Sequence, residues 1–145
     1  MKQNSLIGKT ITAVFIAANG GAIRFDLSDG ELIIAGAVGD CCSSAWIEDI
    51  QGVEQIIGSP IVSVEDVGDM PEKQGNRYGH DEESMAYYGC KITSEKGYAL
   101  IDYRNSSNGR YGGSLVWPND GYFYGGVHGQ NISKEEWRQV ARTAP

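Results

Sequence analysis

Alternation of apolar and polar residues in the first part of the chain constrains the fold more than any other feature. From Thr10 to Ala37, β-branched and aromatic residues recur at every second position, the period of a strand with one buried face. The stretches 19–21 (Asn-Gly-Gly) and 28–30 (Ser-Asp-Gly) interrupt this pattern, and both offer the positive-φ residues that hairpin turns need. The segment therefore predicts three antiparallel strands joined by tight turns.

The same period returns in the second half of the chain. Further strands are predicted over residues 61–67, 85–93, 98–104 and 114–117. The sequence Ser-Glu-Lys-Gly between the second and third of these predicts a hairpin. Residues 68–84 have no apolar period and predict a long loop, a type of segment that is often functional or disordered.

A helical spacing appears near the middle of the chain. Behind the serines at 43–44, which can cap a helix, Trp46, Ile47 and Ile50 lie at positions i, i+1 and i+4. The spacing is repeated over residues 53–57, and a glycine and a proline then provide a stop signal. We therefore predict a short central helical insertion.

A second helix is predicted at the C-terminal end. Ser133 and Glu136 are spaced as a capping box, and Trp137 and Val140 follow at i and i+3. Together these patterns predict an α+β fold, a mainly antiparallel β-sheet of six to eight strands with a short central helical insertion and a C-terminal helix. At 145 residues and 15.7 kDa, we expect residues 1–145 to form a single domain.

Composition limits the classes of function. Twelve basic against 19 acidic residues give a net charge of −7, which argues against binding to a nucleic acid polymer because such binding neutralises many phosphates. The N-terminal sequence lacks the apolar core of a signal peptide, and no run of about 20 apolar residues occurs. We expect a cytoplasmic protein with no membrane partner.

Cysteine and histidine spacing does not favour a metal site. Cys41 and Cys42 are adjacent, Cys90 is alone, and His80 and His128 lie in polar, glycine-flanked stretches. A thiolate at the vicinal pair is a redox alternative, but small buried thiols are the more common role of such residues. We predict no metal and no cofactor.

Enzyme signatures are also missing from the sequence. There is no Gly-x-Ser-x-Gly elbow and no Walker loop, and the glycine-rich stretch 109–113 leads into a predicted strand, whereas a dinucleotide fingerprint opens a helix. Carboxylate pairs could be drawn from Asp26, Glu65, Glu83 or Asp102, but among 19 acids such pairs arise by chance. We predict that the chain is not an enzyme.

The most specific feature is the run from Tyr98 to Gly113. It places Asp102 and Arg104 two residues apart on one face of a strand, followed by a loop rich in amides and hydroxyls. Guanidinium matches phosphate oxygens in pairs, tyrosine stacks on a base, and glycine lets backbone N–H groups approach an anion. The candidate ligand-binding residues of this run are Arg104, Asn105, Asn108, Arg110 and Tyr111.

These residues also have ordinary structural explanations. Asn, Ser and Gly are common in any turn, and Arg104 can pair simply with Asp102. Arg24 alternates with apolar residues, so its default position is the solvated face of a strand. Tyr87 and Tyr88 point to opposite faces of their strand, which leaves one for the core and one for stacking or an interface.

Three stretches, LIGKTI, GDCCSSAWIEDI and YRNSSNGRYGGSL, taken together resemble small phage-borne and prophage-borne domains and the first Thoeris anti-defence family. The resemblance implies an antiparallel sheet with helical additions, assembled as a homo-oligomer in the infected bacterial host. It also implies a sponge that sequesters a glycocyclic ADP-ribose signal, and in some members cyclic oligonucleotides, without cleaving it. Arg24 and Arg104 would contact this ligand.

The resemblance further implies an aromatic residue that stacks on adenine. Tyr88 is our candidate, and Tyr87 and Tyr111 also qualify. Three hypotheses thus follow from the sequence: a sponge for a small nucleotide-derived signalling molecule, a protein-binding phage inhibitor or structural factor without a small-molecule ligand, and a nucleotide hydrolase. The first is the one we favour.

Overall fold

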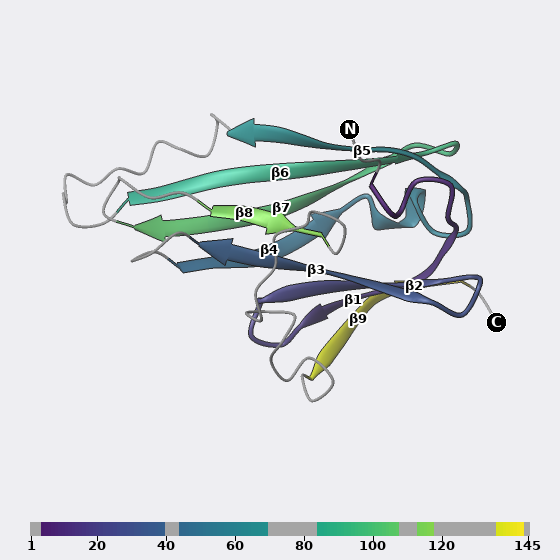
Figure 1. Ribbon diagram of the computed structural model, residues 1–145, viewed down its shortest axis with the longest axis horizontal. Helices are drawn as coiled ribbons and strands as arrows, with labels where there is room; N and C mark the ends of the chain where they lie inside the picture. Colours follow the sequence, from purple (N-terminus) through teal and green to yellow (C-terminus); the bar gives the residue numbers. More distant parts are fainter. Residues whose placement is uncertain (1–3, 40–43, 70–83, 108–112, 118–135, 144–145) are drawn as a thin grey trace.

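The protein is described by a computed structural model over residues 4–39, 44–69, 84–107, 113–117 and 136–143. Its strands are β1 (Ile11–Ala17), β2 (Ala22–Leu27), β3 (Leu32–Gly39), β4 (Ser44–Gln51), β5 (Ile61–Asp69), β6 (Ser84–Ser94), β7 (Tyr98–Ser107), β8 (Gly113–Val116) and β9 (Trp137–Arg142). A single 3₁₀ turn among the described residues, η1 (Val53–Gln55), follows β4. One sheet has the order β8-β3-β2-β1-β9 and the other the order β4-β7-β6-β5, and every pair of neighbouring strands is antiparallel (Figure 1).

The strands predicted over residues 10–37 are confirmed as the hairpins β1–β2 and β2–β3. Phe15 pairs with Arg24, and Arg24 pairs in turn with Ile34, so the three strands are joined in one ladder, with a bulge at Thr12 near the start of β1. Gly20 and Gly30 have φ values of 78° and 90° in the two connecting turns, which the predicted glycine signals require.

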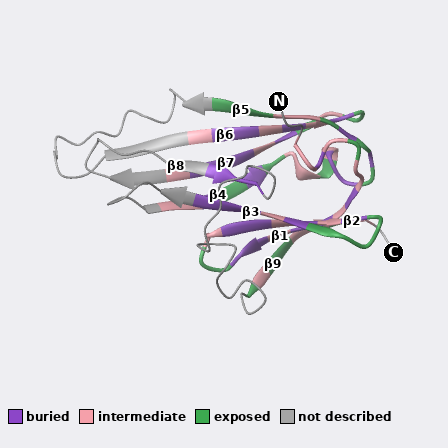
Figure 2. Ribbon diagram, viewed as in Figure 1, coloured by how far each residue is buried: buried purple, intermediate pink, exposed green. Residues whose placement is uncertain are grey.

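The hydrophobic core lies between the two sheets. One cluster of buried side chains draws on both sheets, with Ile23 and Phe25 from β2 and Ile101 and Tyr103 from β7. Phe25 also stacks on Trp117, with ring centroids 5.8 Å apart. Buried residues follow the strands through the middle of the molecule, whereas exposed ones gather at the turns and on β5 (Figure 2). The fold is therefore a two-layer β-sandwich.

The predicted central helix is wrong, because residues 44–51 form strand β4. Ile47 pairs with Tyr103, and Asp49 with Asp102, which leaves Glu48 as the extra residue of a β-bulge. The bulge lets Ile47 and Ile50, three positions apart, both face the core. Residues three positions apart also share one face of a helix, so this spacing in the sequence resembles that of an amphipathic helix. Only η1 in the next segment has a helical turn.

The predicted C-terminal helix is also wrong, because Trp137–Arg142 forms β9 at the edge of the first sheet. Val14 pairs with Ala141 and Phe15 with Gln139, so Val140 is the extra residue of another bulge. Pairing with β1 thus outweighs the i, i+3 spacing. The start of the predicted capping box, residues 133–135, lies outside the described residues. The α+β assignment is corrected to a sandwich of antiparallel sheets.

Strand β5 forms an edge of the second sheet and carries two exposed valines. Val62 and Val67 are 53% and 47% exposed, and each is the extra residue of a bulge against β6. Bulges distort the row of unpaired backbone groups along an edge and so discourage pairing with another chain. The exposure of these valines follows from the irregular edge.

Candidate functional site

Arg104 lies near the end of β7, in the middle of the second sheet. Its register partners are Trp46 on β4 and Tyr87 on β6, so a guanidinium-bearing residue stands between two aromatic residues in one cross-strand row. The Arg104 side chain is 23% exposed. Because its neighbours on β7 alternate in direction, it projects from the sheet face that lies away from the core.

Two carboxylates hold the Arg104 guanidinium in place. Its Nε and one terminal nitrogen donate to the two oxygens of Asp102 at 3.3 and 3.2 Å, and the other terminal nitrogen lies 3.7 Å from Oε1 of Glu48. Trp46 Nε1 donates to that same Glu48 oxygen at 2.9 Å. The β4 bulge therefore has a second effect, because it aims the Glu48 carboxylate at Trp46 and Arg104.

Asp102 is the most enclosed charged group of this cluster. Its side chain is 4% exposed although it lies on the face away from the core. Burying a carboxylate is costly unless it is paired and hydrogen-bonded, and the double contact with Arg104 supplies such pairing. Asp102 thus fixes the plane and the position of the guanidinium, a preorganisation that lowers the entropic cost of binding a ligand.

Arg24 lies in the other sheet and is not part of this cluster. Its guanidinium donates to both oxygens of Asp26, at 2.7 and 3.1 Å, and lies 4.5 Å from the ring centroid of Phe15 and 5.8 Å from that of Trp137. These contacts tie β2 to β1 and β9. The structure therefore gives Arg24 a packing role on the first sheet, and it does not join Arg24 to Arg104 within one chain.

Tyr88 lies on the opposite side of its sheet from Arg104. It is the register partner of Tyr103, and the two rings stack at 5.3 Å on the core-facing side. Tyr103 is buried, and its hydroxyl lies 3.4 Å from Asp66 Oδ1. Burial and the nearby carboxylate raise the pKa of this phenol, so it stays protonated at neutral pH. Within one chain, Tyr87 is the candidate aromatic residue on the Arg104 row.

The remaining predicted site residues are described in part or not at all. The backbone of Asn105 pairs with Ala45 and Ala86, one row beyond Arg104. Three others, Asn108, Arg110 and Tyr111, lie outside the described residues, as do Cys41, Cys42, His80 and His128. In the sequence, Asn108 directly follows the last residue of β7, Ser107.

Sequence reasoning missed Trp46 and Glu48. The predicted central helix places Trp46 on its apolar face and Glu48 on its outer face, and it brings neither to Arg104. The available signal was the run of two acids, Glu48 and Asp49, between two isoleucines, which fits a bulged strand as well as a helix. Only the pairing of β4 with β7 shows that the segment is a bulged strand and not a helix.

Redox and metal chemistry find no support in the part of the chain that the structure describes. Cys90 is a buried, unbridged thiol, and burial together with the charges of Asp66 and Glu65 raises its pKa to about 12, so it is protonated and unreactive at neutral pH. No cluster of three or more His, Cys, Asp or Glu side chains within the described ranges is arranged to hold a metal ion. None of the helical segments in those ranges is long and apolar enough to span a membrane.

Comparison with known proteins gives the family of the chain. Residues 4–117 match the family described as a domain of unknown function, DUF7448, and the chain belongs to this family. The match covers β1 to β8 and ends before β9. No curated protein and no solved structure matches the chain. The family carries no assigned activity, so the likeness to Thoeris anti-defence proteins stays an expectation.

Proposed function

We propose that the chain binds a compact, phosphorylated nucleotide signal of the glycocyclic ADP-ribose type and sequesters it without chemical change. The observation that carries the proposal is the row Trp46–Arg104–Tyr87, with the guanidinium oriented by Asp102 and Glu48. The Trp46 indole and the Arg104 guanidinium both approach Oε1 of Glu48, and an aromatic ring near a fixed guanidinium suits a base and a phosphate together. The likeness to anti-defence sponges gives the same ligand class.

The two carboxylates next to Arg104 oppose the binding of a phosphate at this site. Arg104 stands beside two carboxylates, so an incoming phosphate needs further positive charge or N–H donors nearby. The sequence between β7 and β8 contains Arg110 and two glycines, which fit that requirement chemically. A second copy of the chain in a homo-oligomer is the other source of such groups.

Native mass spectrometry tests the proposal. The full chain is incubated with extract from cells in which TIR enzymes are making their cyclic signals, and bound small molecules are then released by heat and weighed. We expect a complex whose mass exceeds that of the protein by one nucleotide per site, and an unmodified nucleotide on release. A chemically altered product would instead support a hydrolase, and no added mass would support a phage factor that acts on a host protein.

A matched pair of variants tests whether nucleotide binding depends on Arg104. Arg104→Ala removes the guanidinium, and charge-assisted hydrogen bonds of about 1.5–3 kcal/mol predict a loss of affinity of about 10- to 100-fold. Arg138→Ala removes an exposed arginine from β9 with the same change in net charge. Equal binding by the two variants would contradict the proposed location.

A further inference from the structure

The edge strand β4 carries an aromatic residue and a carboxylate that hold each other in place. Trp46 and Glu48 lie on the outer face of the second sheet, on either side of the core residue Ile47. Trp46 Nε1 donates a hydrogen bond to Glu48 Oε1 at 2.9 Å. The two side chains therefore have a defined relative position, although neither residue is buried.

The turn between β1 and β2 packs against the base of Trp46. The backbone N–H of Ile47 donates to the carbonyl oxygen of Gly20 at 2.7 Å. A Cβ atom added at Gly20 would lie 3.2 Å from the Cβ of Trp46, so the turn is in close contact with the strand. The turn on one side and the bond to Glu48 on the other hold the indole, a preorganisation that favours binding.

Glu48 keeps one carboxylate oxygen for a ligand. Its Oε1 accepts from Trp46 and lies 3.7 Å from a terminal nitrogen of Arg104, and the side chain is 43% exposed. Among the residues that the structure describes, no donor bonds to Oε2. Asp102 differs, because both of its oxygens accept from Arg104. Glu48 Oε2 is therefore a fixed and accessible acceptor next to Arg104.

The Trp46 indole also has a surface for a ligand. Its N–H edge is used by Glu48, and within the described ranges no aromatic ring or cation stacks on its face. A sugar ring has the matching chemistry, because its C–H face packs on an aromatic ring while its hydroxyl groups donate to a carboxylate. In dinucleotide-binding proteins an acidic side chain accepts from a ribose hydroxyl in this way.

Charge disfavours other ligand groups at this position. A phosphate oxygen is repelled by the Glu48 carboxylate, and a cation is repelled by the Arg104 guanidinium, 3.7 Å from it. A neutral hydroxyl group meets neither repulsion, and a carboxylate accepts from it more strongly than a neutral oxygen does. The group best suited to Glu48 Oε2 is therefore a hydroxyl.

We infer that Trp46 and Glu48 form the ribose subsite of the nucleotide site, in which the sugar ring lies against the indole and its vicinal hydroxyls donate to the Glu48 carboxylate. This inference rests on the proposed nucleotide function. Glu48 is then a specificity-determining residue, which favours a ribose over a deoxyribose. Its carboxylate, which opposes a phosphate, contributes to affinity through the sugar of the same ligand.

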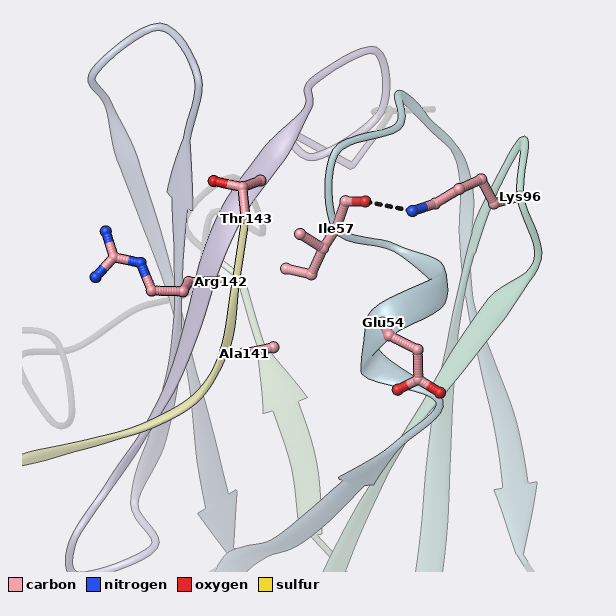
Figure 3. Close-up of a pocket in the computed structure, with 6 residues that line it drawn as sticks. All are labelled: Glu54, Ile57, Lys96, Ala141, Arg142 and Thr143. Carbon is pink, nitrogen blue, oxygen red and sulfur yellow. Dashed lines mark hydrogen bonds between the residues drawn. The ribbon is translucent and has the colours of Figure 1, made fainter. Parts of the chain in front are cut away.

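Glu54 provides the matched control, because it is an exposed glutamate without the contacts of Glu48. It lies on η1, beyond the end of β4, beside a cavity of about 280 Å³ (Figure 3). Its carboxylate points away from Ile57 and from the Lys96 ammonium, which donates to the Ile57 carbonyl oxygen at 2.7 Å (Figure 3). Glu54→Gln therefore makes the same chemical change as Glu48→Gln at a carboxylate that no described side chain orients.

Titration of the ¹⁵N-labelled full chain followed by NMR tests the subsite. The probes are glycocyclic ADP-ribose, D-ribose 5-phosphate and 2-deoxy-D-ribose 5-phosphate. We expect Glu48→Gln, which replaces an acceptor oxygen by an NH₂ group, to bind glycocyclic ADP-ribose at least about tenfold more weakly, and Glu54→Gln to bind it as the wild type does. The wild type should bind ribose 5-phosphate at least about fivefold more tightly than the deoxy form, and Glu48→Gln should bind both equally.

The results separate this inference from the proposed function. Absence of glycocyclic ADP-ribose binding by the wild type would overturn both. Binding by the wild type with equal affinity in Glu48→Gln, or equal binding of the two sugar phosphates by the wild type, would overturn the ribose subsite alone. Trp46→Phe keeps an aromatic ring but loses the N–H that orients Glu48, so it should also reduce the preference for ribose. An unchanged preference in Trp46→Phe would contradict the positioning of Glu48 by the indole.

Discussion

An arginine and an aspartate two positions apart on one strand form an ion pair over a buried aromatic residue in each sheet. The pair is Arg24 with Asp26 across Phe25 on β2, and Asp102 with Arg104 across Tyr103 on β7. Strand alternation explains the arrangement, because residues i and i+2 share a face while i+1 points to the core. In each case the partner fixes the guanidinium, and the surrounding residues decide its use. Phe15 and Trp137 pack on Arg24, whereas Arg104 lies 3.7 Å from the Glu48 oxygen that also accepts from Trp46.

Gly52 and Gly30 provide a residue-scale prediction about turns. Both have positive φ, but a Cβ atom on Gly52 would lie 2.9 Å from the carbonyl oxygen of Tyr98, whereas one on Gly30 meets nothing within 4 Å. Gly30→Ala is expected to lower the free energy of unfolding by about 1–2 kcal/mol, the cost of the left-handed conformation. Gly52→Ala should cost at least about 1 kcal/mol more, because backbone must move. Urea unfolding measures both, and equal costs would contradict the close approach of η1 to β7.

The buried thiol of Cys90 makes stability depend on pH in the alkaline range. Its pKa rises from 9.0 in the unfolded chain to about 12 in the folded protein, mainly through burial. A raised folded-state pKa contributes stability that is complete below pH 9 and is lost as the pH rises toward 12. Between pH 8 and pH 10.5, we expect the thiol to lower the free energy of unfolding by about 2 kcal/mol.

Comparison with Cys90→Ala isolates this effect. The variant is less stable at pH 8 because it leaves a cavity, but its loss between pH 8 and pH 10.5 should be smaller by about 2 kcal/mol. Tyr103 and the other titrating groups are common to both proteins. Urea unfolding at the two pH values gives the difference, and an identical loss in both proteins would show that the thiol is not desolvated.

At the scale of elements, the sequence predicts strands well where apolar residues keep a period of two, and poorly where a bulge places two apolar residues three positions apart. The strands β1, β2 and β3 are confirmed although β1 has a bulge at Thr12, and β5 is confirmed although Val62 and Val67 are extra residues in it. In β4 and β9 an extra residue, Glu48 or Val140, shifts the period from two to three within the strand. A period of three is also that of a helix, so local pattern cannot separate the two. The partner strand decides, and it lies far away in the sequence.

Single-residue deletions test the role of the bulge in β4. Deleting Asp49 leaves Ile47 and Ile50 two positions apart with Glu48 between them, so both isoleucines still face the core. We expect a folded protein that loses no more than about 1 kcal/mol. Deleting Leu100 from the regular strand β7 instead places Ala99 and Ile101 on opposite faces and should unfold the chain. Far-UV circular dichroism and thermal melting compare them, and similar behaviour of the two deletions would contradict the register.

At the scale of the whole molecule, the two sheets separate residues that the sequence treats as one group. Arg104 was found from the residue types around it, but Trp46 and Glu48 reach it only through the pairing of β4 with β7. Arg24 was joined to Arg104 by family likeness, and it lies on the other sheet with partners of its own. Sequence pattern selected Arg104 as a candidate, and long-range strand pairing gave its neighbours.

Isothermal titration of the full chain with a purified glycocyclic ADP-ribose tests the central proposal most directly. The account predicts saturable binding with one ligand per site, a 10- to 100-fold weaker affinity in Arg104→Ala, and a wild-type affinity in Arg138→Ala. The nucleotide recovered afterwards should have its original mass. No binding heat at concentrations up to the millimolar range, or wild-type affinity in Arg104→Ala, would contradict the account.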